Sequence, residues 1–267
     1  MPLARIGSKL IYFAHIPKCA GSSVEDYLEE RFGLLAFLDR THLDAAASTQ
    51  WSRSSPQHVD WASLNKMIPR DFIDEAFAVI RHPLSRAVSA YRFQAEVEGT
   101  IAEGMGFGDW LRAEAAKRDM DPFRNDNHLR PQVEFLPPEG SGLPCAVFHM
   151  EHGLDALVPY LDHLDGQARG PRGLRFSNTA GHNTAAKGAW NVGHVKPDAQ
   201  ERALVMRLYS QDFEQLGYQI DDPAPLTPAP SLSPEDVVAA ATYRTKAAHP
   251  LNRVARGMRR RLRALKR

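Results

Sequence analysis

The chain has 267 residues, of which 43% are hydrophobic, 9% aromatic and 24% charged, and its formal net charge is +1. This composition is typical of a globular protein and excludes a disordered, collagen-like or disulfide-scaffold chain. No apolar run approaches the roughly 20 residues that span a bilayer, and the first residues lack a signal-peptide pattern, so we expect a cytoplasmic protein. The two cysteines, Cys19 and Cys145, have no metal-ligand spacing, and we expect free thiols.

The positive charge is concentrated at the end of the chain. Residues 253–267 contain eight arginines and lysines and no acidic residue, which leaves 25 basic against 32 acidic side chains in the rest. An anion-binding site in the body must therefore be a local cluster of positive groups rather than a property of the whole surface.

Apolar patterns predict strands that alternate with helices. The strands are expected at residues 9–14, 75–80 and 145–148, and the helices at 23–32, 83–93, 153–164 and 198–215. Strands separated by helices in this way predict an α/β fold, in which a central, mostly parallel sheet is flanked by helices on both faces.

The sequence also predicts the domain organisation. We expect one domain over residues 1–220, a proline-rich linker over 221–235 and a basic tail over 236–267. From Leu251 onward, apolar residues recur at helical spacing among arginines, a pattern that predicts either a helix lying on an anionic membrane surface, such as the inner face of the cell membrane, or a solvated tail without a partner. No groove-reading motif is present, so nucleic acid is not an expected partner.

Residues 15–23, with the sequence HIPKCAGSS, join the first predicted strand to the first predicted helix. A loop that enters a helix offers unpaired backbone N–H groups, and Lys18, Ser22 and Ser23 add a charge and two hydroxyls. The pattern predicts a site for a phosphate or sulfate group, although a capped helix after an exposed lysine is the simpler alternative. It differs from the ATP-binding P-loop pattern because the lysine precedes Gly21.

Residues 81–91, with the sequence RHPLSRAVSAY, follow the second predicted strand. Arg81 stands at the strand end, and Ser89 follows eight residues later on the predicted helix. Arginine is the fork-shaped donor suited to phosphate, so we expect Arg81 and Ser89 to reach one anion.

These two motifs, in this order, resemble the 5′-phosphosulfate loop and the 3′-phosphate motif of sulfotransferases that use 3′-phosphoadenosine 5′-phosphosulfate (PAPS). The resemblance is to the carbohydrate family, which includes heparan and chondroitin sulfotransferases and many bacterial relatives, and it covers about residues 8–220. It implies a P-loop-like three-layer fold, PAPS as co-substrate, adenosine 3′,5′-bisphosphate as product, and no metal.

The resemblance implies a role for each residue of the two motifs. Lys18 is the catalytic group on the leaving side, because charge develops on the leaving phosphate oxygen. The donor-binding residues that it implies are Pro17, Lys18, Cys19, Ala20, Gly21, Ser22, Ser23, Arg81 and Ser89.

The acceptor hydroxyl requires a general base, for which histidine is the usual residue. The resemblance places a catalytic histidine between the two motifs and so implicates His58, for which a surface or capping role is the alternative. His128 is the second candidate for the base, but with Arg130 and Gln132 it forms a polar cluster that we expect instead to hold a carbohydrate or glycolipid acceptor. Residues 177–188 are expected either to close over the nucleotide or to form a polar surface loop.

The sequence therefore predicts a sulfotransferase that acts by in-line displacement with a histidine base. Two alternatives stay open at this point, a nucleotide-binding protein without acceptor chemistry and an ATP-dependent small-molecule kinase on the same fold.

Overall fold

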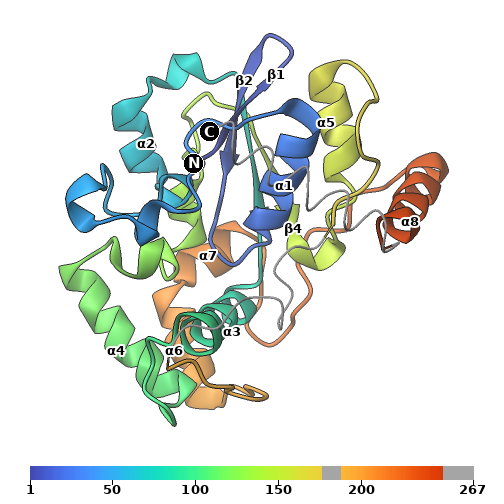
Figure 1. Cartoon of the computed structure of the whole chain (residues 1–267). Coiled ribbons are helices and arrows are strands. Elements are labelled where there is room, and N and C mark those ends of the chain that lie inside the picture. Colours follow the sequence, from blue (N-terminus) through green and yellow to red (C-terminus); the bar gives the residue numbers. More distant parts are fainter. Residues whose placement is uncertain (176–187, 249–267) are drawn as a thin grey trace.

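The computed structural model describes residues 1–175 and 188–248 and has a four-stranded sheet at its centre (Figure 1). The strands follow one another across the sheet in chain order, as β1 Leu3–Ile6, β2 Lys9–Ala14, β3 Glu75–Ile80 and β4 Cys145–His149. The strands β2, β3 and β4 are parallel, whereas β1 pairs antiparallel with β2. The predicted mostly parallel sheet is confirmed, and β1 is an addition that the sequence did not suggest.

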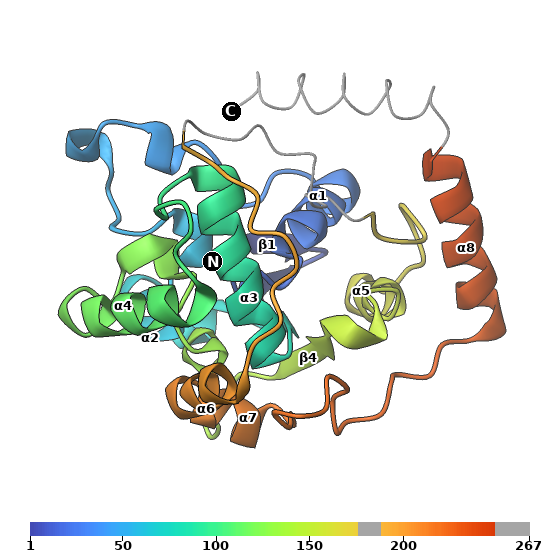
Figure 2. The same ribbon diagram turned by 90° about the horizontal axis from the view of Figure 1, so that it is seen from below.

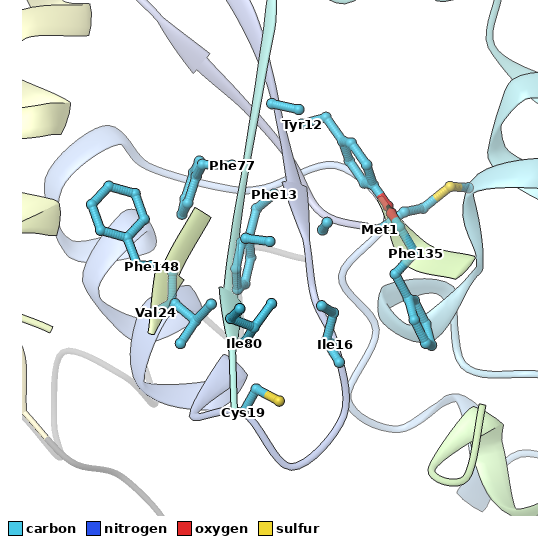
Figure 3. Close-up of a cluster of buried hydrophobic side chains, with 14 of the residues drawn as sticks. Met1, Tyr12, Phe13, Ile16, Cys19, Val24, Phe77, Ile80, Phe135 and Phe148 are labelled. Carbon is cyan, nitrogen blue, oxygen red and sulfur yellow. Dashed lines mark hydrogen bonds between the residues drawn. The ribbon is translucent and has the colours of Figure 1, made fainter. Parts of the chain in front are cut away.

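One face of the sheet is covered by α1 (Gly21–Phe32) and α5 (Leu157–Asp165). The rings of Phe13 and Phe77, partners in the β2–β3 register, stack with centroids 5.0 Å apart, and Phe148 of β4 continues this apolar surface (Figure 3). Tyr160 of α5 contacts both Phe77 and Phe148, while Val24 of α1 packs on the same side. Alternate residues of the parallel strands thus form the first half of the core.

The opposite face is covered by α2 (Trp61–Met67) and the 3₁₀ turn Gln132–Phe135. Tyr12 points to this side, where its ring lies 5.9 Å from that of Trp61 and its hydroxyl donates to the carbonyl of Phe135 (Figure 3). The central sheet between helices on both faces is the predicted α/β, P-loop-like architecture.

Local sequence signals explain where several helices begin. Asp60 caps α2 by accepting a hydrogen bond from the backbone N–H of Ser63. Pro83 occupies the first turn of α3 (Pro83–Phe93), where its missing N–H costs nothing. The helix then continues as a π-helical turn, Gln94–Glu98, which ends at Gly99 with a positive φ.

A second group of helices packs around α3 (Figure 2). It comprises α4 Phe107–Met120, α6 Ala199–Leu208 and α7 Ser210–Gln215. The single helix predicted over residues 198–215 is divided at Tyr209, which is buried and donates its hydroxyl to the carbonyl of Leu129. The start at Asp198 is confirmed, because its side chain forms a capping box with Glu201.

The helix α8 (Pro234–Ala248) begins inside the predicted linker and extends into the predicted tail. It is attached to the body by two ion pairs, Arg244 with Asp155 at 2.6 Å and Asp236 with Arg172 at 3.3 Å. The predicted amphipathic helix after residue 250 and nearly all of the predicted closing loop, residues 177–187, lie outside the described residues, so both stay predictions. Within the described part of the chain, no helix is long and apolar enough to span a bilayer.

Candidate active site

The loop over residues 15–20 connects the end of β2 to the start of α1 and contains two residues with positive φ. Lys18 has a φ of 68° and Ala20 a φ of 62°, which turn the chain sharply into the helix. The ring of His15 packs directly against Gly21, so that a Cβ added at this glycine would overlap the imidazole. Gly21 is therefore required by the close approach of two backbone segments.

A buried hydrogen bond between His15 and Glu25 fixes the beginning of this loop to α1. The Nδ1 atom of His15 lies 2.5 Å from Oε1 of Glu25, and both side chains are buried. Burial alone would raise the pKa of the Glu25 carboxyl, but the nearby His15 and Arg40 reverse this effect and lower it to about 2. His15 thus packs at the end of the strand and shapes the loop.

The N-terminus of α1 presents backbone donors at the end of this loop. The N–H groups of Ser23 and Val24 bond to the carbonyl of Ala20, whereas those of Gly21 and Ser22 have no partner among the residues that the structure describes. Free N–H groups and the positive end of the helix dipole favour an anion. The side chain of Ser22 is partly exposed, but that of Ser23 is buried.

Lys18 lies beside α3, where its Nζ atom sits 3.6 Å from the centre of the Phe93 ring. Burial lowers the pKa of Lys18 from 10.5 to about 8, an effect that Glu98 opposes and Arg81 reinforces. An incoming anion would offset this penalty, because Lys18 forms no ion pair with a carboxylate within the part of the chain that the structure describes.

The second motif, residues 81–91, contains two arginines in different surroundings: Arg81 contacts the loop, and Arg86 is buried. Arg81 directly follows β3, and its Nη1 donates to the carbonyl of Lys18 at 3.3 Å. Ser89 lies on α3 and is partly exposed, and its hydroxyl has no hydrogen-bond partner within residues 1–175 and 188–248. Of these two side chains, Arg81 contacts the loop directly.

Arg86, by contrast, is only 1% exposed and acts as an internal brace. Its Nε donates to the carbonyl of Pro17, and its Nη2 donates to the carbonyls of His128 and Arg130 at 3.1 and 2.7 Å. This guanidinium therefore joins the anion-binding loop to the segment around residue 128.

His58 lies at the end of the 3₁₀ turn Pro56–His58 and forms a hydrogen-bonded triad. Its Nδ1 lies 2.6 Å from Oδ2 of Asp126 and 3.1 Å from the hydroxyl of Ser55, which itself donates to Asp126 at 2.7 Å. Burial would raise the pKa of the Asp126 carboxyl, but His58 and the other nearby donors hold it well below its usual range. A carboxylate on Nδ1 leaves Nε2 of His58 as the proton acceptor.

The backbone around Asp126 is held in an uncommon conformation. Asn125, Asp126 and Asn127 have φ values of 50°, 52° and 61°, which asparagine and aspartate tolerate better than other non-glycine residues. The side chain of Asn125 donates to Glu114, and that of Asn127 donates to the carbonyl of His58. These contacts compensate the backbone strain and keep Asp126 aimed at His58.

A row of ring contacts connects His58 with Lys18. The His58 ring lies 5.5 Å from that of His128, which lies 5.3 Å from Phe93, the ring on which Lys18 rests. The rings of His128 and Phe93 thus lie between the predicted base and the predicted leaving-side lysine. His128 is buried, its pKa is well below the usual value because of burial, and its Nδ1 has no hydrogen-bond partner among the described residues.

The other two predicted acceptor residues take different positions. Arg130 stays partly accessible and pairs with Glu134 at 2.8 Å. Gln132 is fully buried, donating to the carbonyl of Arg81 and accepting from the Arg81 N–H and the Cys19 thiol. In this structure Gln132 belongs to the scaffold, and an acceptor could reach it only after these bonds break.

Cys19 lies in the loop with its side chain buried. Burial raises the pKa of its thiol to about 12, so the thiolate needed for a nucleophile is not available near neutral pH. Cys19 can contribute to an anion site only through its backbone.

His58, Asp126 and His128 place ligand-type atoms within 4.8 Å of one another. However, the 2.6 Å between His58 Nδ1 and Asp126 Oδ2 is a hydrogen-bond distance. Two atoms that ligate one tetrahedral ion at about 2.1 Å each would lie farther apart, at about 3.4 Å. The observed geometry is therefore that of an imidazole–carboxylate hydrogen bond.

The comparison with protein families decides the class of this site. A model described as the sulfotransferase family matches residues 5–219, which include the loop, the second motif and the His58–Asp126 pair. The chain belongs to the sulfotransferase family. Comparisons with curated proteins and with solved structures gave no match.

As a sulfotransferase, the protein transfers a sulfuryl group, and its family generally uses PAPS as the sulfate donor. The sequence interpretation did not single out Asp126, although this residue lies within the region, about residues 8–220, that resembles the family. Its hydrogen-bond partner His58 is 68 positions away, so no local pattern links the two residues. The one signal in the sequence is that Asp126 stands between two asparagines, because Asn and Asp tolerate the positive φ of a sharp turn.

Proposed function

We propose that this sulfotransferase transfers the sulfuryl group of PAPS to a hydroxyl of a carbohydrate or glycolipid, with His58 as general base. The observation that supports it most strongly is the convergence of a carboxylate-oriented imidazole, His58 with Asp126, and a lysine at an anion-binding helix N-terminus, Lys18. One group accepts the proton of the attacking hydroxyl and the other neutralises the departing phosphate.

The donor fits the residues at the start of α1. The free N–H groups of Gly21 and Ser22 would hold the 5′-phosphosulfate, and Lys18 would exchange the face of Phe93 for an anionic oxygen. The pKa of about 8 that burial gives Lys18 supports this role, because a cation buried without a close counter-charge gains most from an anionic ligand.

The 3′-phosphate is assigned to Arg81 and Ser89. The guanidinium of Arg81 has donors beyond the one used on the Lys18 carbonyl, and the Ser89 hydroxyl has no partner within the described residues. A site that binds the 3′-phosphate would discriminate PAPS from ATP and 5′-AMP, which lack this group.

The reaction balances without a further reactant. The acceptor oxygen forms a bond to sulfur while the bond from sulfur to the bridging phosphate oxygen breaks, and adenosine 3′,5′-bisphosphate leaves. The hydroxyl proton passes to Nε2 of His58, and Asp126 stabilises the imidazolium through Nδ1. Lys18 offsets the charge that develops on the leaving oxygen.

Calorimetric titration with adenosine 3′,5′-bisphosphate, 5′-AMP and ATP tests the donor assignment. We expect micromolar binding of the bisphosphate alone and at least tenfold weaker binding in Lys18→Ala and Arg81→Ala. The control is Arg92→Ala, which removes a cation of α3 that pairs with Glu96. Equal or preferential binding of ATP would contradict the proposal and favour a kinase.

Transfer of ³⁵S from labelled PAPS to a panel of saccharides and glycolipids tests the acceptor chemistry. We expect turnover that falls about 10²- to 10⁴-fold in His58→Ala, with bisphosphate binding unchanged. Bisphosphate binding without transfer to any acceptor, and without donor breakdown, would instead identify a nucleotide-binding protein.

A further inference from the structure

The two residues Arg81 and His82 link the end of β3 to the start of α3 and belong to neither element. Three backbone groups of this link bond to side chains from distant segments. The N–H and the carbonyl of Arg81 bond to Gln132, and the N–H of His82 bonds to Glu151. The backbone that carries the proposed 3′-phosphate ligand is therefore held by side chains rather than by a strand or a helix.

Gln132 makes a two-point contact with the backbone of Arg81. Its Oε1 accepts from the Arg81 N–H at 2.9 Å, and its Nε2 donates to the Arg81 carbonyl at 2.8 Å. A residue in a neighbouring antiparallel strand bonds to its partner in the same way. Because the N–H precedes the Cα atom and the carbonyl follows it, the two bonds fix the backbone on both sides of that atom. They therefore set the direction in which the Arg81 side chain leaves the chain.

Gln132 is itself firmly held. It is fully buried, and its backbone N–H donates to Oδ2 of Asp212, another fully buried residue, at 3.0 Å. Its Oε1 also accepts from the thiol of Cys19 at 3.4 Å. One side-chain amide thus contacts both donor motifs, the loop through Cys19 and residues 81–91 through Arg81.

Glu151 holds the next peptide group from the other side. It lies in the 3₁₀ turn after β4, where its Oε1 accepts from the His82 N–H at 2.7 Å and its Oε2 accepts from the Tyr218 hydroxyl at 3.0 Å. Since a peptide group is planar, the Arg81 carbonyl and the His82 N–H belong to one rigid unit. Gln132 and Glu151 therefore hold this unit at both of its polar groups, and we call the two residues the Arg81 clamp.

The side chain of Arg81 is held far less than its backbone. Its guanidinium donates to the carbonyl of Lys18 at 3.3 Å and forms no ion pair with any residue that the structure describes. The residue is partly exposed, so a ligand can reach it. Ordering a long side chain on binding costs free energy. A fixed backbone lowers this cost, because it restricts the space that the guanidinium can sample.

We propose that Gln132 and Glu151 are positioning residues, which hold the backbone at Arg81 so that its guanidinium is aimed at the 3′-phosphate of the donor. This inference rests on the proposed function, because it requires that Arg81 binds that phosphate. It assigns to Gln132 a part in donor binding without any contact with the ligand. It also adds Glu151, which the sequence patterns did not single out.

Calorimetric titration of the full chain with adenosine 3′,5′-bisphosphate tests the Arg81 clamp. We expect Gln132→Met and Glu151→Ala each to weaken binding about three- to tenfold, the effect of one net hydrogen bond. Glu151→Gln keeps an oxygen for the His82 N–H, so its affinity should stay within about twofold of the unsubstituted chain. Glu139→Ala is the matched control, because Glu139 is exposed and lies in the segment before β4, away from both motifs in the sequence.

A double-mutant cycle with Arg81→Ala separates positioning from general support of the fold. Once the guanidinium is absent, Gln132→Met and Glu151→Ala should no longer affect bisphosphate affinity. A residue that only stabilises the fold would weaken binding by the same factor in both backgrounds. Equal factors, or unchanged affinity of a folded single variant, overturn the role of that residue. Because Glu151 is exposed, its variants keep the inference testable if Gln132→Met, at a buried position, does not fold.

The single variant Arg81→Ala distinguishes the two levels of failure. A loss of about tenfold in Arg81→Ala, with unchanged affinity in both variants of the Arg81 clamp, rejects the positioning role and leaves the proposed function in place. Unchanged affinity in Arg81→Ala itself contradicts the assignment of the 3′-phosphate to this residue, and overturns the inference together with it.

Discussion

The Nδ1 atom of His58 lies 2.6 Å from the Oδ2 atom of Asp126, although the two residues are 68 positions apart in the chain. The carboxylate selects the tautomer in which Nδ1 bears the proton, so that Nε2 presents a lone pair. It also stabilises the imidazolium that forms when His58 accepts a proton. In the proposed reaction, the pair directs the proton of the acceptor hydroxyl to Nε2 of His58.

Replacement of Asp126 by asparagine tests this positioning role. We expect turnover to fall at least tenfold in Asp126→Asn, because an amide can stabilise the wrong tautomer and supplies no charge. The ¹⁵N shifts of the His58 imidazole should report the change of tautomer, which a merely structural role would not produce. Asp109→Asn is the control, since Asp109 pairs with Arg112 on an exposed face of α4. Unchanged imidazole shifts would count against the assignment.

Donor-product affinity is expected to decrease as the pH rises through about 8. Burial gives Lys18 a pKa of about 8, so the ammonium is charged below that pH and loses its proton above it. Each unit of pH above this value should therefore weaken binding of adenosine 3′,5′-bisphosphate by up to about tenfold. Calorimetry between pH 6.5 and 9.5 measures the effect, and Lys18→Met should abolish the pH dependence. A dependence that persists in Lys18→Met would show that another group is responsible.

Loss of Arg86 is expected to destabilise the whole domain. In Arg86→Met the carbonyls of Pro17, His128 and Arg130 lose their buried donor. Since each unsatisfied buried group costs about 1–3 kcal/mol, we expect the free energy of unfolding to fall by about 3 kcal/mol or more. Urea denaturation measures this quantity. Arg92→Met, at an exposed ion pair of α3, should change it by less than about 0.5 kcal/mol, and equal effects of the two variants would argue against a brace.

Gly21→Ala is expected to damage the donor loop. The added methyl group would overlap the His15 ring, so the imidazole or the start of α1 must move, at a cost of about 1–3 kcal/mol. Thermal unfolding and bisphosphate titration should both report the change. The control is Gly106→Ala, at the start of α4, where a Cβ would meet nothing within 4 Å. A variant with normal stability and normal bisphosphate affinity would contradict the proposed packing.

The sequence predicted the three parallel strands well, because each is a short apolar run followed by a turn. It did not reveal β1, whose four residues are too short a pattern to stand out. The helices α2 and α4 were also missed, since α4 has no clear apolar stripe and α2 spans only seven residues. Short elements of this kind depend on tertiary packing rather than on local preference.

In the site too, features set by neighbouring residues could be predicted from the sequence, whereas features set by contacts between distant segments could not. The loop with Lys18 and Gly21 could be predicted because a helix start has local sequence signals. The Asp126–His58 bond and the scaffold position of Gln132 could not, since both depend on contacts with distant segments. The sequence indicated a polar cluster at His128, Arg130 and Gln132. Only the fold shows that Asp126 bonds to the proposed base His58, whereas Gln132 bonds to the backbone of Arg81.

The donor loop is the direct continuation of β2, a strand with hydrogen-bonded neighbours on both sides. Amides in such an inner strand open to solvent only when the domain unfolds globally, so hydrogen exchange should be slowest there. The loop itself is held by hydrogen bonds from Arg86 and Arg81 to the carbonyls of Pro17 and Lys18, so the conformational entropy of ordering it is lost during folding. If the loop binds the donor as proposed, it would do so without an ordering penalty, which favours rapid capture and release of nucleotide over slow induced fit.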